Sequence, residues 1–272
     1  MKKIFILAAL LPCLIIFSGF IKWVDFDVTG AELNRANRLH KETGVSTCEI
    51  LALWGIKVKD IDDIDKHREN KWFKRLFESY SAVLDGIICS DSGEVIGHHP
   101  IAKGFWHTGG DDFGNSRTFG FKRRHLGHDL FGGVGTPIIA VEGGTVTELG
   151  WNRYGGWRVG IRSECTKRYY YYAHLRKNKP FAAGLELGSV VAAGDVIGYL
   201  GRTGYSRKEN VNMSNAKPHL HFGMQLIFDP SQEDGSGEIW IDVYPICKFL
   251  EKHKMKVIKD EATKEYTSQR DG

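Results

Sequence analysis

The spacing of apolar residues changes character near residue 100 of this 272-residue chain. Before that point, apolar and aromatic positions recur at helical spacing and predict three helices, over 32–42, 46–55 and 69–84. Ser46-Thr-Cys-Glu49 is a capping box, which is typical of a helix start. We interpret the aromatic stripe of the third helix as core packing.

After residue 100, glycine becomes frequent and short runs of Val, Ile and Tyr alternate with turns. Such runs are typical of an antiparallel β domain. We therefore predict an α+β fold class, with an all-β antiparallel domain that follows a small helical region. A closing helix is expected over 245–254, and the polar residues 259–272 are expected to be frayed. The predicted strands lie at 136–142, 144–149, 157–162, 168–174, 195–200, 219–228 and 238–243.

The first 23 residues have the pattern of a membrane-directed segment. Lys2 and Lys3 precede an apolar run from Ile4 to Ile21, which is typical of an export signal. This run lies at the lower edge of membrane-spanning length, and no small-x-small cleavage site follows it. We expect an uncleaved single-pass anchor with everything after Trp23 outside the cell membrane. A cleaved signal that releases the rest of the chain is the alternative.

These patterns divide the chain into four predicted parts. They are a signal or anchor segment at 1–23, a helical region at 24–100, a β domain at 101–255 and a polar tail at 256–272. The formal net charge is only +4, and Lys and Arg are spread along the chain. This distribution argues against a nucleic-acid-binding protein, which would carry a basic stripe or patch.

The cysteines point to no redox or metal motif. The chain contains no Cys-x-x-Cys pair, which argues against a thiolate zinc site or a dithiol redox centre. Because an exported chain could form disulfides, two bridges are an alternative to isolated thiols. We expect isolated thiols at the scattered positions Cys48, Cys89, Cys165 and Cys247.

The candidate chemistry lies in histidine-bearing segments of the β domain. His219 and His221 are two positions apart in a predicted strand, so their imidazoles share one face. His125 and Asp129 form a His-x-x-x-Asp pair. Imidazole nitrogen and carboxylate oxygen both suit zinc, and a catalytic zinc site uses three protein ligands and an open fourth position. His125, Asp129 and one histidine of the His-x-His pair make such a set.

A further histidine, His174, ends the run Tyr169-Tyr-Tyr-Tyr-Ala-His174. Strand alternation would place it on the same face as Tyr170 and Tyr172. Considered alone, a histidine in this position is more typical of a core residue with a hydrogen-bond partner than of a catalytic group.

Together these segments resemble the LytM/lysostaphin-type zinc metallopeptidases, peptidase family M23, over roughly residues 105–250. Further matching segments separate the histidine motifs and occur in the order typical of that family. The motifs that carry the resemblance are His125-x-Gly-x-Asp129, Tyr-x-His174-Leu, Pro-His219-Leu-His221-Phe, Gly133-Val-Gly-Thr-Pro, Gly150-Trp-Asn-Arg-Tyr-Gly155-Gly and Ala193-Gly-Asp-Val-Ile-Gly198.

The resemblance implies a β fold with a substrate groove and a single Zn²⁺ cofactor. It also implies hydrolysis of amide bonds in peptidoglycan stems or cross-bridges by zinc-activated water, and a place at the bacterial cell membrane or, after cleavage, in the cell wall. By this resemblance, His125, Asp129 and His221 are the zinc ligands, and His219 and His174 are the catalytic histidines. Arg117, Tyr154 and Gly155 are the implied substrate-binding residues.

Two other functions are compatible with parts of the sequence. A non-hydrolytic relative could use the same scaffold to bind the cell wall or a partner, although such relatives typically lack metal ligands. A biotin- or lipoyl-carrier hairpin would need a lysine at an exposed turn, and none occurs over 185–201. The polar segments 207–217 and 231–237 depart from the family pattern and are expected to affect specificity.

The remaining histidines of the β domain receive no catalytic role. His128 would point away from the metal if residues 127–130 are extended. His98, His99 and His107 could form a second site, but we expect them to be solvated loop residues.

Overall fold

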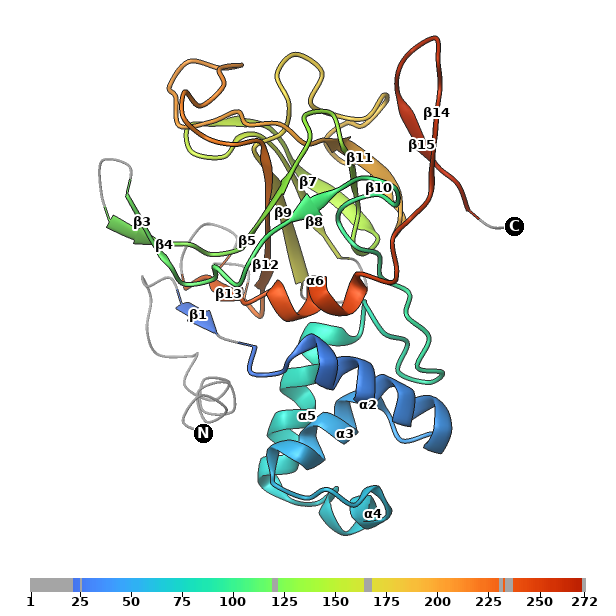
Figure 1. Cartoon of the computed structure of the whole chain (residues 1–272). Helices are drawn as coiled ribbons and strands as arrows, with labels where there is room; N and C mark the ends of the chain where they lie inside the picture. Colours follow the sequence, from blue (N-terminus) through green and yellow to red (C-terminus); the bar gives the residue numbers. More distant parts are fainter. Residues whose placement is uncertain are drawn as a thin grey trace.

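The computed structural model describes residues 22–24, 26–118, 122–163, 168–229, 232 and 237–270. Helices α2, α3 and α5 lie together at one end and the main β-sheet occupies the other, with α6 between them (Figure 1). The helices are α2 (Gly30–Thr43), α3 (Thr47–Gly55), the 3-10 turn η1 (Ile61–Asp63), α4 (Ile64–His67), α5 (Lys71–Leu84) and α6 (Tyr244–Leu250).

The main sheet runs in the order β1-β13-β12-β9-β8-β7-β10, while β5 pairs with one end of β12 and β2 pairs with β5. Among the described strands, every pairing is antiparallel except the parallel pair β1–β13. The strands of the main sheet are β1 (Lys22–Val24), β2 (His107–Thr108), β5 (His128–Gly132), β7 (Gly144–Asn152), β8 (Gly156–Arg162), β9 (Arg168–Ala173), β10 (Val190–Val191), β12 (His219–Leu226) and β13 (Ile239–Ile241).

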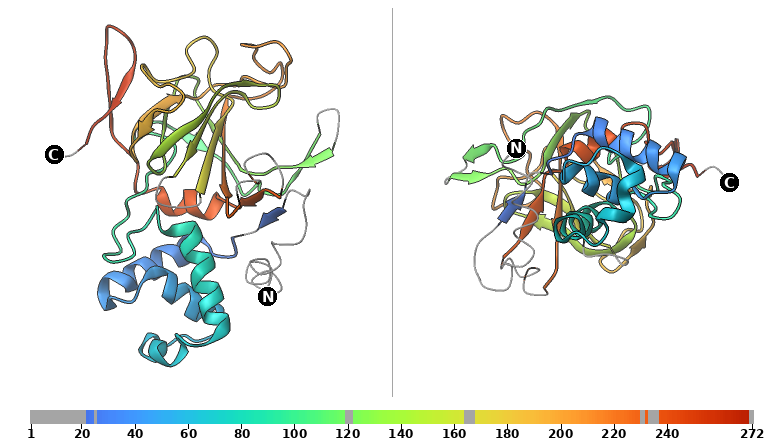
Figure 2. Two further views of the ribbon diagram at one scale, coloured as in Figure 1. Left: turned by 180° about the vertical axis from the view of Figure 1, so that it is seen from behind. Right: turned by 90° about the horizontal axis from the view of Figure 1, so that it is seen from below.

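Three smaller two-stranded sheets surround the main sheet. They pair β3 (Ser116–Thr118) with β4 (Lys122–Arg124), β6 (Pro137–Ile139) with β11 (Val196–Tyr199), and β14 (Val257–Lys259) with β15 (Tyr266–Ser268). Seen from behind and from below, the β3–β4 and β14–β15 hairpins project on opposite sides of the sheet (Figure 2).

The predicted fold class is confirmed as a mostly antiparallel β domain with a few helices, and α2, α3 and α5 occupy the three predicted helical segments. The expectation of a frayed tail is wrong, because β14 and β15 form a hairpin there. This hairpin is held to the sheet domain, since the Tyr266 amide donates a hydrogen bond to the Tyr199 hydroxyl at 3.0 Å. The polar composition of this segment did not indicate that it packs against the β domain.

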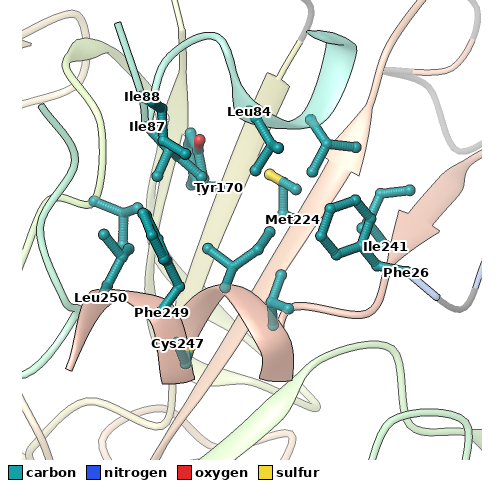
Figure 3. Packing of buried hydrophobic residues seen from close by; sticks show 14 of the residues in the cluster. Phe26, Leu84, Ile87, Ile88, Tyr170, Met224, Ile241, Cys247, Phe249 and Leu250 are labelled. Atoms are coloured by element: carbon teal, nitrogen blue, oxygen red, sulfur yellow. The ribbon is translucent and has the colours of Figure 1, made fainter. Parts of the chain in front are cut away.

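The buried core is continuous from the helices to the sheet. Figure 3 shows Leu84 and Ile87, at the end of α5, in the same packing layer as Phe249 of α6 and Tyr170 and Met224 of the sheet. Each of these side chains is at most 1 % exposed, and full burial of one large apolar side chain stabilises a fold by about 1.5–3 kcal/mol. The helices therefore share one core with the domain that carries the site.

A buried ion pair links the same two regions. Arg168 of β9 donates to Glu142 through Nε at 2.7 Å and through Nη2 at 2.9 Å, and its Nη1 donates to the Ala82 carbonyl of α5 at 3.0 Å. Burial opposes ionisation of Glu142, but Arg168 outweighs this effect and holds the pKa of that carboxyl below its usual range. Gly86 lies against the pair, where a Cβ would be 1.9 Å from Glu142 Oε1.

The predicted membrane segment falls mostly outside the described residues, since 1–21 are not among them. Lys22–Val24, at its end, form strand β1 rather than helix. In the described part of the chain, no helix combines the length and apolarity needed to cross a membrane. Cys48, Cys89 and Cys247 are free thiols as predicted, and Cys165 lies outside the described residues.

Candidate functional site

Strand β12 is the centre of the site because it pairs with β9 along one edge and with β5 along the other. His219 and His221 are two positions apart on this strand, so both imidazoles lie on one face. The register places His221 opposite Asp129 of β5 at one edge. At the other edge His221 is opposite Ala173, the residue before His174. Segments that are far apart in the sequence therefore meet on one face of the sheet.

We call His125, Asp129 and His221 the first cluster. His125 Nε2 lies 3.0 Å from Asp129 Oδ1 and 2.9 Å from His221 Nδ1, and His221 Nδ1 lies 3.2 Å from Asp129 Oδ1. Ligand atoms around a tetrahedral zinc ion with bonds of about 2.0–2.1 Å lie roughly 3.3 Å apart. The two nitrogens and one oxygen therefore fit a zinc ion that keeps a fourth position open.

Asp112 supports the first cluster and was missed by sequence reasoning. Its Oδ2 lies 3.1 Å from His125 Nδ1, and its Oδ1 lies 3.0 Å from His128 Nδ1. Burial opposes ionisation of Asp112, but its contacts with His125 and His128 lower the pKa to about 2. A carboxylate on the far nitrogen of a ligand histidine fixes the ring and raises its basicity. The available signal was an acidic pair after two glycines, Gly109-Gly-Asp-Asp112.

Arg117, an implied substrate residue, lies on β3 and contacts the first cluster. Its Nη2 donates to Asp129 Oδ2 at 3.2 Å and to Asp112 Oδ2 at 2.9 Å. Burial opposes ionisation of Asp129, but the hydrogen bonds from His125 and His221 hold its pKa well below the usual range. Asp129 is therefore a carboxylate, with one oxygen in the cluster and the other on a guanidinium.

The two accessory histidines face each other beside the first cluster. The ring centroids of His174 and His219 are 4.7 Å apart, and His219 Nε2 lies 3.9 Å from Asp129 Oδ1. His219 Nδ1 is 2.7 Å from the Lys217 carbonyl, and His174 Nδ1 is 2.8 Å from the Thr203 carbonyl. When each Nδ1–H donates to its carbonyl, both Nε2 atoms are left for chemistry.

His174 is held in an unusual backbone conformation. Its φ of 62° is in the left-handed region, which is unfavourable for a residue with a side chain. Its amide donates to the Gly155 carbonyl at 2.7 Å. Burial and the neighbouring histidines lower the pKa of His174 well below its usual value, so the ring is uncharged.

An open groove of about 680 Å³ contains the first cluster, both accessory histidines and the three implied substrate residues in its walls. Tyr154 forms part of the rim and lies under the guanidinium of Arg123 at 5.6 Å. Gly155 is packed closely, since a Cβ there would lie 2.2 Å from the Tyr171 hydroxyl. This close packing is enough to explain why residue 155 is a glycine, and no contact with a substrate is needed to explain it.

The polar segment 207–217 lies next to this groove. Asn210 Oδ1 accepts hydrogen bonds from Trp157 Nε1 at 3.0 Å and from the Asn178 amide at 2.8 Å. The groove wall reaches Tyr205, just before the segment. Of the other polar segment, 231–237, only residues 232 and 237 belong to the described part of the chain.

The remaining histidines divide into two groups. His128 lies outside the first cluster, against Asp112 and the ring of Tyr244.

The expectation that His99 and His107 are solvated loop residues is wrong. His99 is 0 % exposed and lies with His107 and Glu251 in a group that could hold a metal ion. The sequence around His99 and His107 gives no sign that they contact Glu251, the residue after α6.

Comparison with known proteins agrees with these motifs. Residues 123–232 match the sequence model of "Peptidase family M23". An L-Ala–D-Glu endopeptidase of Bacillus subtilis (strain 168) is 34% identical over 182 residues, which is 67% of this chain and 49% of that protein. Lysostaphin of Staphylococcus simulans is 36% identical over 99 residues, which is 36% of this chain and 17% of that protein. The chain therefore spans at most about half the length of these relatives.

One solved structure has the same fold over most of its length. It is from Ruminococcus gnavus ATCC 29149 and is provisionally named a glycyl-glycine endopeptidase, lytM. The match has a TM-score of 0.63 and 24% identity, and it covers 84% of this chain and 90% of that chain. At this identity the likeness concerns the fold alone. With the sequence matches and the motif residues in place, residues 123–232 of this chain are identified as a domain of peptidase family M23.

Proposed function

We propose that this chain is a zinc-dependent endopeptidase that hydrolyses amide bonds in the peptide part of bacterial peptidoglycan. The observation that carries the proposal is the spacing of 2.9–3.2 Å within the first cluster, whose residues line an open groove. The relatives named as an L-Ala–D-Glu endopeptidase and as lysostaphin support the reaction class.

The first cluster would hold the zinc ion through His125 Nε2, Asp129 Oδ1 and His221 Nδ1. When bound, zinc supplies Lewis-acid polarisation of the scissile carbonyl and makes water acidic enough to react near neutral pH. Asp112 holds the far nitrogen of His125, and Arg117 holds the second oxygen of Asp129. These contacts orient the donors before any ion binds, which favours a single geometry.

His219 and His174 would handle protons and charge. Nε2 of His219 faces the first cluster, so it can accept a proton from the attacking water and return it to the leaving amine. With Nδ1–H donating to the Thr203 carbonyl, Nε2 of His174 carries a lone pair that can accept a hydrogen bond from the attacking water and help to hold it.

The charge of the groove favours an anionic peptide over a neutral glycine bridge. Five arginines line the groove against three acidic residues, a difference of two positive charges, and the binding of a carboxylate by a positively charged cleft is favourable. A stem that contains D-Glu carries such a carboxylate, as does the substrate named for the Bacillus relative. The charged lining residues are Arg117, Arg123, Arg124, Arg158, Arg162, Asp129, Glu148 and Glu238.

The proposal places the groove outside the cell membrane, where peptidoglycan lies. A membrane anchor at residues 1–23, with the domain outside the cell, is part of the same proposal, and release to the cell wall after cleavage is its alternative. The apolar run behind Lys2 and Lys3 supports this location.

The test is digestion of purified peptidoglycan by the full chain, with the released fragments identified by mass. Two substrates are compared, one cross-linked directly through stem peptides and one cross-linked through glycine bridges. We expect cleavage of both walls within the D-Glu-containing stem, abolished by a chelator and restored by zinc. Cleavage confined to glycine bridges would reject the substrate choice but keep the hydrolase.

Two controls separate catalysis from binding. His219→Ala should retain zinc and bind peptidoglycan without releasing fragments. If the unaltered, zinc-loaded chain binds both walls and releases no fragment, the non-hydrolytic alternative is correct and the proposed enzyme is rejected.

A further inference from the structure

A second group of metal-binding residue types lies outside the groove. We call His99, His107 and Glu251 the second cluster. Glu251 Oε1 lies 3.5 Å from His107 Nε2 and 3.8 Å from His99 Nε2, and one donor atom from each residue lies within 4.8 Å of the others. The cluster joins the segment before β2, the start of β2 and the residue after α6.

His99 has a polar atom that lacks a hydrogen-bond partner. The residue is 0 % exposed, and its Nε2, which faces Glu251, forms no hydrogen bond within the described part of the chain. Nδ1 lies 3.3 Å from the Ile101 carbonyl oxygen and 3.1 Å from the Ile101 amide nitrogen, so Ile101 fixes the ring. Buried polar atoms normally have a partner, and an exception often marks an ion or water site.

A histidine binds a metal ion only through a ring nitrogen that carries no proton, so the tautomer of His99 matters here. In the structure the Ile101 amide donates to His99 Nδ1. Binding of an ion at Nε2 therefore requires the tautomer in which Nδ1–H donates to the Ile101 carbonyl oxygen, 3.3 Å away. In that tautomer the Nε2 lone pair points at the cluster, which is the arrangement that metal-bound histidines commonly adopt.

A cation already lies against the other two members. The Lys254 ammonium is 2.7 Å from His107 Nε2 and 2.8 Å from Glu251 Oε2. The Lys254 ammonium does not pair with His99, whose Nε2 has no hydrogen-bond partner in the described part of the chain. The lysine side chain is flexible and 19% exposed, so it can turn away into solvent. A divalent ion in its place would contact His99 as well.

A small cavity of about 120 Å³ gives access to the cluster. His107 and Glu251 form part of its lining, together with Thr108, Cys247 and Lys248. A metal site needs an entry path as well as donors. The cavity is separate from the groove, and the two have no lining residue in common.

We propose that His99, His107 and Glu251 form a second zinc site, which binds the ion when Lys254 turns outward. Two imidazoles and one carboxylate are a donor set typical of zinc. The bound ion would tie the segment before β2 to the end of α6, so its role is structural. The proposal does not depend on the proposed peptidase activity.

The test is zinc content of the full chain, measured by elemental analysis after equilibration with excess zinc and removal of the unbound ion. The background is Asp129→Ala/His221→Ala, which removes two donors of the first cluster. We expect about two zinc ions per unaltered chain and about one per background chain. We also expect zinc to raise the melting temperature of the background protein, because an ion that binds only the folded state stabilises it.

Addition of His99→Asn to the background should abolish both the remaining zinc and the thermal shift. A background that binds no zinc, or a His99→Asn variant that keeps it, would overturn the proposal. His67→Asn, at the end of α4, is the matched control for the loss of one histidine. It should change neither the zinc content nor the shift in melting temperature.

Two further variants keep the test decisive if His99→Asn does not fold. Glu251→Gln changes a residue with a 33% exposed side chain and should weaken zinc binding by about 10–100-fold in the same background. Lys254→Met removes the competing ammonium and should tighten binding by about tenfold. Zinc affinity unchanged by both substitutions would reject the second cluster as the site.

Discussion

The first and second clusters contain similar residue types but differ in how nearly their donor atoms are placed for a metal. In the first cluster the three donors are 2.9–3.2 Å apart. In the second cluster the contacts with Glu251 are 3.5 and 3.8 Å, and Lys254 lies against two of the members. One cluster is ready for an ion, and the other has to exchange a lysine first.

The difference follows from the elements that carry the donors. His221 and Asp129 are directly paired residues of neighbouring strands, so backbone hydrogen bonds fix their separation. Glu251 follows the end of a helix, and His99 lies in a segment without regular structure. Donors on paired strands are more rigid than donors on loops and helix ends. We therefore expect tighter zinc binding at the first cluster.

The largest expected effect comes from Asp129→Ala, which removes a donor and leaves Arg117 without that partner. We expect loss of one zinc ion and a fall in peptidoglycan cleavage by several orders of magnitude, because water is not acidic enough without the metal. Zinc content and fragment release are measured on the same preparation. His107→Asn, in the second cluster, should also lose one zinc ion but should keep cleavage. If it abolished cleavage while the protein stayed folded, the two clusters would not be separate in function.

The next effect separates the roles of the two histidines of β12. His219→Ala should lower the cleavage rate by about 10²–10⁴-fold, which is typical for the loss of a general acid–base group. Zinc content should remain that of the unaltered chain, because His219 is not a donor in the first cluster. Equal loss of zinc in His219→Ala and His221→Ala would show that the assignment of ligand and base is wrong.

The contrast between the clusters also shows what the sequence could predict. The shared face of His219 and His221 follows from strand alternation alone, and the proximity of His125 and Asp129 was expected from their spacing and from the family resemblance. Within the first cluster, only the choice of His221 over His219 needed the resemblance. Local pattern was informative because Asp129 and His221 lie on regular strands and His125 is only four residues before Asp129.

Asp112 and the second cluster could not be predicted in this way. Asp112 lies in a glycine-rich segment whose path is set by contacts with His125 and His128. Glu251 and His107 are far apart in the sequence, and they meet only because α6 packs under the sheet. Tertiary packing brings these residues into contact, and the periodicity of neither segment indicates that contact.

Gly127 tests how tightly the first cluster is built. A Cβ at this position would lie 2.5 Å from the Phe222 carbonyl oxygen and 2.8 Å from His221 Nε2 and Cε1. Gly127→Ala should therefore push the His221 ring and weaken zinc binding at the first cluster by about tenfold or more. Zinc affinity is measured by competition with a coloured chelator. The control is Gly110→Ala, where a Cβ would meet nothing within 4 Å and the backbone φ is unstrained; equal losses in both variants would contradict the packing argument.

The smallest effect on activity is expected from partial removal of zinc. A chelator added in steps to the fully loaded chain should take the ion of the second cluster first, because Lys254 is close by to replace it. The first equivalent should therefore leave with no change in the cleavage rate, and activity should fall only with the second. Zinc release and fragment release are followed in the same titration. If the cleavage rate fell in proportion to the first ion removed, the first cluster would be the weaker site, and donor spacing would not be what determines affinity in this fold.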